Sequence, residues 1–208
     1  MNVATFGSNL RHSDSPCESL RSDMQRRGTL SATANNVLMP RPTIRTRRVT
    51  DLDQCVQALR AVHETNAYPL NWPADPRRWL SPPRLLQAWI AEGVEGTVDG
   101  HVAVERTHSE NAGHHVELSR LFVAPAARRR ALASALVDHV RTWAAEQDYD
   151  LTLNVTDDHR SPAIAFYEAT GWQHTHTTGA DWTTPDGGPV KLRHYILTSS
   201  TRHTGKIQ

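Results

Sequence analysis

The residues best placed to do chemistry lie in a strand, a loop and a helix that follow one another. The segment from Glu117 to Val123 is mostly apolar, as in a buried strand, and apolar residues recur at helical spacing after Pro125. The first backbone amides of such a helix are free to bind phosphate oxygens. The arginines 128–130 would add charged donors, although an arginine run is also typical of a solvated face. In many α/β domains a strand, loop and helix of this kind only pack against each other and bind no ligand, so phosphate binding needs further support.

That support comes from a second segment further along the chain. The two segments read ELSRLFVAPAAR at 117–128 and SPAIAFYEATGW at 161–172. Together they resemble the paired signatures of the GCN5-related N-acetyltransferase (GNAT) family. The resemblance implies a single α/β domain with a mixed, mostly antiparallel sheet flanked by about four helices. It also implies that the sheet splays between strands four and five, here 116–123 and 150–155, with acetyl-CoA bound in the gap.

The resemblance assigns the acetyl-CoA contacts to strand four, to the loop and helix start after it, to strand five and to the second signature. The residues are Leu121, Phe122, Val123, Arg128, Arg129, Arg130, Ala131, Leu132, Ala133, Asn154, Arg160 and Ala163. Two of them depart from the family pattern. Arg160 stands where many members carry an Asn, and Ala131 replaces a glycine that lets the backbone approach the pyrophosphate. Glycine at 131 is expected to loosen the helix start by up to about 1 kcal/mol, the cost of glycine relative to alanine in a helix.

The resemblance also implies two catalytic side chains. Tyr167 matches the family tyrosine that protonates the departing thiolate. The alternative role for Tyr167 is that of an aromatic residue that only packs in the core. Glu117 matches a carboxylate that deprotonates the acceptor ammonium in some members. Its alternatives are a solvent-facing strand residue or an ion-pair partner of Arg120. The oxyanion of the reaction should be held by a backbone N–H near Val123.

The acceptor amine is expected over the first two predicted helices, the connection 63–80 and a turn-rich insert at 177–191. Aromatic and acidic residues there either pack or attract a cationic amine: Tyr68, Trp72, Trp79, Asp181, Trp182 and Asp186. The function implied is acetyl transfer from acetyl-CoA to a primary amine of a small molecule or a protein N-terminus. The alternative is a degenerate family domain that binds CoA weakly or acts as a non-catalytic interaction module.

No metal is expected, since neither His114-His115 nor His174-X-His176 is completed by further ligands at a suitable spacing.

Composition limits the class of protein. The 208 residues carry 23 Lys and Arg against 22 Asp and Glu, so a formal net charge of +1 favours neither nucleic acid nor anionic lipid as a partner. Two cysteines and the absence of a long apolar run predict a cytoplasmic protein, as a monomer or homodimer. We expect a disordered tail at 1–40, the transferase domain at 42–198 and a flexible tail at 199–208.

Periodicity predicts the elements that position these residues. Helices are expected from Thr50 to about residue 62, over 81–93, from 132 to 143 and over 162–171. Strands are expected at 101–106, 116–123, 150–155, 172–178 and 192–198. The pair 101–106 and 116–123 should form a hairpin, and the strand, helix and strand from 116 to 155 should form a parallel crossover.

Overall fold

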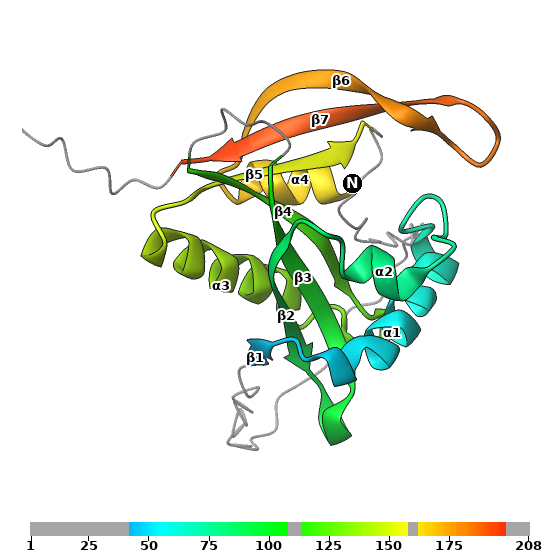
Figure 1. Cartoon of the computed structure of the whole chain (residues 1–208), viewed down its shortest axis with the longest axis vertical. Coiled ribbons are helices and arrows are strands. Elements are labelled where there is room, and N and C mark those ends of the chain that lie inside the picture. The colour runs from blue at the N-terminus through cyan, green and yellow to red at the C-terminus, as the bar shows by residue number, and fades with distance from the viewer. Residues whose placement is uncertain (1–41, 108–113, 158–161, 199–208) are drawn as a thin grey trace, which may run out of the picture. The chain divides into compact units, whose positions relative to one another are not determined.

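A seven-stranded sheet with helices on both faces forms the fold (Figure 1). The computed structural model of the chain describes residues 42–107, 114–157 and 162–198. The strands are β1 (Thr43–Thr46), β2 (Leu85–Glu92), β3 (Val98–Arg106), β4 (His115–Val123), β5 (Asp150–Thr156), β6 (Gln173–Thr183) and β7 (Pro189–Leu197). The helices are α1 (Leu52–Asn66), α2 (Pro76–Leu80), α3 (Leu132–Glu146) and α4 (Pro162–Ala169), with short 3₁₀ turns at Val49–Asp51, Val94–Gly96 and Pro125–Ala127.

The sheet opens between β4 and β5. Its strand order is β1-β2-β3-β4-β5-β7-β6, and every neighbouring pair of described strands is antiparallel except β4 and β5. That parallel pair is in register only from His115 opposite Asp150 to Glu117 opposite Thr152. Both strands continue beyond this point, β4 as far as Val123. The mixed sheet, splayed between its fourth and fifth strands, is therefore confirmed.

Two apolar clusters fill the two faces of the sheet. Leu136 and Val140 of α3 pack with Leu121 of β4 in one cluster, while Leu59 of α1 packs with Phe122 in the other. Neighbouring residues of a strand point to opposite faces, so β4 supplies both clusters. Figure 1 accordingly shows α1 and α2 on one side of the central strands and α3 on the other. The strands between these layers separate after Glu117, so a ligand can enter the sheet at that place.

One predicted helix was wrong. The segment 81–93 forms strand β2 from Leu85 to Glu92. Its apolar residues fit a helical stripe, but Trp89 packs in the cluster with α3 and Ile90 in the cluster with α1. A central strand buried on both faces shows no polar alternation, so spacing alone does not separate it from a buried helix.

Helix starts also differ from the expectation. The α1 helix begins at Leu52 after a 3₁₀ turn, so Thr50 is not its cap. The short helix α2 was not predicted, although Asp75 followed by a first-turn proline is a start signal. The Asp75 carboxylate accepts a hydrogen bond from the backbone N–H of Arg78 at 3.0 Å.

The expected insert at 177–191 is mostly strand. β6 continues to Thr183 and β7 starts at Pro189, so the two strands form a long hairpin. Within this hairpin, the carbonyl of Thr183 accepts a hydrogen bond from the side-chain amide of Asn71 at 2.9 Å. The connection between α1 and α2 therefore touches the hairpin, although the two are far apart in sequence. The tails 1–40 and 199–208 lie outside the described residues.

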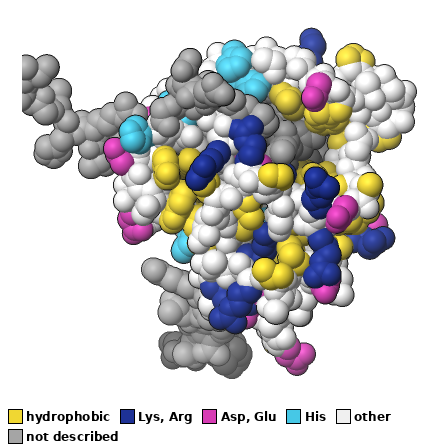
Figure 2. Space-filling view, in the orientation of Figure 1, with side chains coloured by type: hydrophobic (Ala, Val, Ile, Leu, Met, Phe, Trp, Pro, Cys, Tyr) yellow, Lys and Arg dark blue, Asp and Glu magenta, His cyan; other side chains and the backbone are white. Residues whose placement is uncertain are grey.

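The visible surface carries charge of both signs. Figure 2 shows basic and acidic side chains interspersed over one face of the molecule. Within the described ranges, no helix combines the length and apolarity required to cross a bilayer.

Candidate active site

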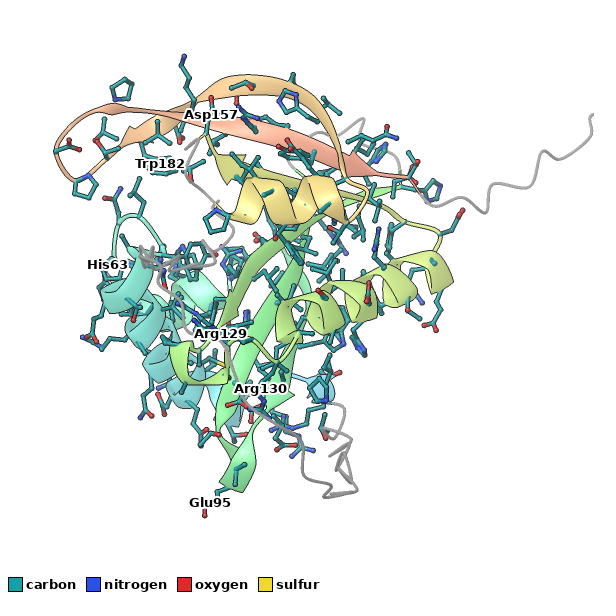
Figure 3. The ribbon with its side chains drawn as sticks, turned by 180° about the vertical axis from the view of Figure 1, so that it is seen from behind. His63, Glu95, Arg129, Arg130, Asp157 and Trp182 are labelled. Carbon is teal, nitrogen blue, oxygen red and sulfur yellow. The ribbon has the colours of Figure 1, made fainter. Side chains whose placement is uncertain are left out.

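The loop after β4 brings the arginine run to the start of α3. Arg129 and Ala131 both have positive φ angles, of 63° and 53°, and the helix begins at Leu132. Figure 3 shows the side chains of Arg129 and Arg130 on this loop. The first amides of α3 have no acceptor within the helix, so the loop and helix start together suit an anionic group.

Ala131 occupies a backbone conformation that glycine prefers. It is the N-cap residue of α3, with φ 53° and ψ 22°, in the left-handed region. A residue with a β-carbon is strained there by roughly 1–2 kcal/mol. The assumption that Ala131 is helical was therefore wrong, and so was the expectation that glycine would loosen the helix start.

We expect Ala131→Gly to raise the free energy of unfolding by about 1 kcal/mol, since glycine relieves the left-handed strain at this position. Urea unfolding of the two proteins measures the change. Ala135→Gly is the matched control, because Ala135 lies inside α3, where glycine should lower stability by about 1 kcal/mol. Equal losses in both variants would show that residue 131 is helical in solution.

The three arginines of the run have different partners. The guanidinium of Arg128 donates a hydrogen bond to the side-chain oxygen of Asn66, and Arg130 pairs with Asp99 at 2.9 Å. Within the described part of the chain, Arg129 is exposed and makes no hydrogen bond or ion pair. Arg129 is therefore the arginine that can meet an anion without losing an existing contact, a distinction that the sequence did not make.

Tyr167 is a fully buried tyrosine of α4. Its ring packs edge-on against Phe166 and Trp172, with ring centroids 5.1 and 5.6 Å away. The hydroxyl has no hydrogen-bond partner among the described residues. Burial raises the pKa of Tyr167 well above its usual value, so the phenol stays protonated at neutral pH. A buried, unpaired hydroxyl costs free energy that phenylalanine would avoid, which points to a use for the proton.

Glu117 lies at the last position at which β4 pairs with β5, where the sheet begins to open. Its carboxylate accepts a hydrogen bond from the side-chain amide of Asn154 at 2.8 Å. Asn154 belongs to β5, two residues past the position opposite Glu117, so the bond spans the start of the gap. The alternative expectation, an ion pair between Glu117 and Arg120, was wrong, because the Arg120 guanidinium binds Glu105 of β3.

Residues 53–172 match the family model described as the acetyltransferase (GNAT) family, which is more than half of the 208 residues. The chain belongs to the GNAT family. No curated protein matches this GNAT chain.

Solved structures share the fold of this GNAT chain. The ribosomal-protein-S18-alanine N-acetyltransferase of Escherichia coli superposes with a TM-score of 0.64 and 19% identity, over 81% of this chain and 100% of its own. The ribosomal-protein-alanine N-acetyltransferase of Brucella melitensis gives 0.62 and 21%, over 76% and 99%. Arabidopsis thaliana NAA60, in complex with a bisubstrate analogue, gives 0.58 and 18%, over 74% and 97%. At these low sequence identities, the superpositions show a common fold.

The other expected acetyl-CoA residues of this GNAT chain lie around the opening. Leu121, Phe122 and Val123 are on β4 beyond its pairing with β5, and Leu132 and Ala133 open α3. The small, fully buried Ala163 is in α4. Arg160 lies outside the described residues.

The expected acceptor residues divide into packed and exposed groups. Tyr68 is buried with its ring centroid 6.1 Å from that of Trp79, and Trp72 lies 5.2 Å from the ring of His63. On the hairpin, Trp182 is half-buried, while Asp181 and Asp186 are exposed. Figure 3 shows Trp182 on the hairpin and His63 on the helix below it.

The histidines of β6 and β7 lie close together without forming a metal cluster. His176 and His194 stack with ring centroids 4.3 Å apart. Throughout the described ranges, no group of three or more His, Cys, Asp or Glu side chains is placed to hold a metal ion.

A buried polar cluster, which was not predicted from the sequence, lies beneath α1 and α2. Its members are fully or almost fully buried: His101, Glu105, Ser119 and Arg120. A signal for them was present, since polar residues interrupt two strands that are otherwise apolar. Polar residues at such positions require partners inside the protein.

Proposed function

We propose that this protein transfers an acetyl group from acetyl-CoA to a primary amine of a small molecule or a protein N-terminus. The observation that carries the proposal is the opening between β4 and β5, with Glu117 at its start and Tyr167 in the cluster that packs against both strands. The loop and first turn of α3 support binding of the CoA phosphates, because they combine an anion-binding helix start with Arg129, which has no partner among the residues that the structure describes.

Each side chain then has one task. Glu117, oriented by Asn154, takes a proton from the acceptor ammonium, and the neutral nitrogen attacks the thioester carbon. Backbone N–H groups of β4 near Val123 stabilise the oxyanion. As the carbon–sulfur bond breaks and the carbon–nitrogen bond is complete, Tyr167 donates its proton to the sulfur. The second proton of the nitrogen replaces the one that Tyr167 has given, and the proton taken by Glu117 passes to solvent, so one proton is released overall.

The acceptor is proposed to bind where the connection between α1 and α2 meets the β6–β7 hairpin. Aromatic side chains there offer packing surface, and Asp181 and Asp186 offer negative charge for an amine. Two of the similar structures are named as N-acetyltransferases of ribosomal-protein alanine, which makes a peptide N-terminus a sensible first acceptor. We propose a cytoplasmic monomer or homodimer, with the transferase domain at 42–198.

A non-catalytic domain is the alternative, because Ala131 places a β-carbon where the family has glycine. The test follows thiol release from acetyl-CoA with a panel of small amines and peptides that begin with alanine. We expect release that depends on the amine. We also expect acetyl-CoA, but not ATP, to raise the melting temperature, since binding at 100 times Kd stabilises by about 2.7 kcal/mol. A melting shift without thiol release would support a non-catalytic CoA-binding domain. The absence of both effects would reject the proposed activity and favour the interaction module.

A further inference from the structure

Strand β4 contains a bulge at Arg120, beside the gap in the sheet. The residue has a φ of 49°, a rare conformation for a bulky side chain. Opposite it, the pairing of β3 with β4 shifts between His101, which faces Phe122, and Ala103, which faces Ser119. A bulge inserts one residue and changes the direction of the amides that follow. A strained residue of this kind persists only if its surroundings hold it in place.

The backbone of the bulge is held by His101. The Nδ1 atom of His101 lies 2.9 Å from the carbonyl oxygen of Arg120, and an oxygen of this kind only accepts, so Nδ1 carries the proton. The Nε2 atom lies 3.0 Å from a guanidinium nitrogen of Arg47, which only donates. Burial, followed by the charge of Arg47, lowers the pKa of His101 to about 3. His101 therefore stays neutral, with both ring nitrogens engaged.

The side chain of the bulge residue is held by two further elements. The Arg120 guanidinium binds the carboxylate of Glu105 on β3 and the carbonyl oxygen of Trp79 in α2. It also lies over the Trp79 ring, 4.9 Å from the centroid. Ser119 donates a hydrogen bond to Glu105 at 2.5 Å. Burial lowers the pKa of Arg120 to about 10, which leaves the guanidinium charged at neutral pH.

The bulge decides which amides of β4 face the gap. The N–H of Ala124 donates to the carbonyl of Asp99 on β3 at 2.8 Å. Hydrogen bonds of an antiparallel pair alternate along the strand, so Phe122 also faces β3 and Val123 points its N–H group to the other edge. The alternation is interrupted at the bulge, but the Arg120 carbonyl is bound by His101 of β3, so the N–H of Leu121 in the same trans peptide points away from β3. That edge looks toward β5, from which β4 has separated after Glu117.

We propose that His101 and Arg120 are positioning residues for the acetyl transfer. They hold the bulge in the conformation that turns the amides of Leu121 and Val123 toward the thioester carbonyl. Arg47 binds the second ring nitrogen of His101, and Glu105 binds the Arg120 guanidinium. This inference rests on the proposed function, because the amides act only if acetyl-CoA binds in the gap.

The experiment compares His101→Leu with His101→Gln. Leucine fills the space without polar atoms, whereas glutamine can donate to the Arg120 carbonyl and accept from Arg47. We expect His101→Leu to lower kcat about tenfold with the KM for acetyl-CoA changed less than about threefold, and His101→Gln to restore most of kcat. Val140→Ala, in the apolar cluster of α3, is the control that lowers stability without lowering kcat.

A second measurement needs no acceptor. The infrared frequency of the labelled thioester carbonyl in bound acetyl-CoA reports how strongly backbone amides polarise it. We expect a downshift in the wild type that is reduced in His101→Leu and in Arg120→Lys, while acetyl-CoA still raises the melting temperature of both. If both variants keep the full downshift and kcat, the positioning role is rejected and the proposed function stands. If the wild type neither binds nor turns over acetyl-CoA, both fail together.

Discussion

Glu105→Gln is expected to lower the free energy of unfolding by about 3–5 kcal/mol, because it leaves the charge of Arg120 buried without its counter-ion. The side chains of the two residues are 4% and 1% exposed, so water cannot replace the carboxylate. The pair lies between β3, β4 and α2, so its loss should destabilise the whole domain rather than one element. Urea denaturation followed by tryptophan fluorescence measures the loss.

The matched control is the exposed pair Asp138 and Arg141 on α3, 3.5 Å apart with Asp138 68% exposed. Asp138→Asn should change stability by less than about 0.5 kcal/mol. Adding Arg120→Met to Glu105→Gln should recover part of the loss, since it removes the unpaired charge. Equal effects of Glu105→Gln and Asp138→Asn would mean that the ion pair is open to water in solution.

Tyr167→Phe is expected to lower kcat by about 100-fold or more while acetyl-CoA binding and stability are retained. A positioned general acid contributes about 10²–10⁴ in rate, and phenylalanine keeps the ring that packs between Phe166 and Trp172. Because the hydroxyl has no partner among the described residues, its removal should not lower the melting temperature. Steady-state kinetics and thermal unfolding test the two parts separately.

Tyr195→Phe serves as the control for loss of a buried tyrosine hydroxyl. The hydroxyl of Tyr195 donates to Glu168 at 3.0 Å, so this variant should lose stability and keep kcat. The opposite pattern is expected for Tyr167→Phe. Full turnover in Tyr167→Phe would make Tyr167 a core aromatic and assign protonation of the thiolate to water.

The sequence by itself determined the succession of elements from β3 to α4. In α3, Leu136 and Val140 repeat at helical spacing, and the helix covers one face of the sheet. The hairpin of β3 and β4, the strand β5 and the helix α4 were also predicted, and the two signatures identified the family. Local pattern was sufficient there because each element follows its own periodicity.

The sequence was insufficient at one strand whose apolar residues also fit a helical stripe, and where distant segments meet. Strand β2 looked like a helix because Trp89 and Ile90 are buried on opposite faces. The left-handed Ala131 could not be seen, since the conformation is imposed by the loop that joins β4 to α3.

Only the tertiary structure decided which polar groups meet. Glu105 and Arg120 are 15 residues apart in the sequence. Arg120 pairs with Glu105 rather than with the nearer Glu117 because of the register between β3 and β4 and the bulge in β4. Register is a property of the paired strands rather than of either segment, and a shift of one residue moves a side chain to the other face. The bond from Asn154 to Glu117 likewise exists because β5 lies beside β4 up to the point where the sheet opens.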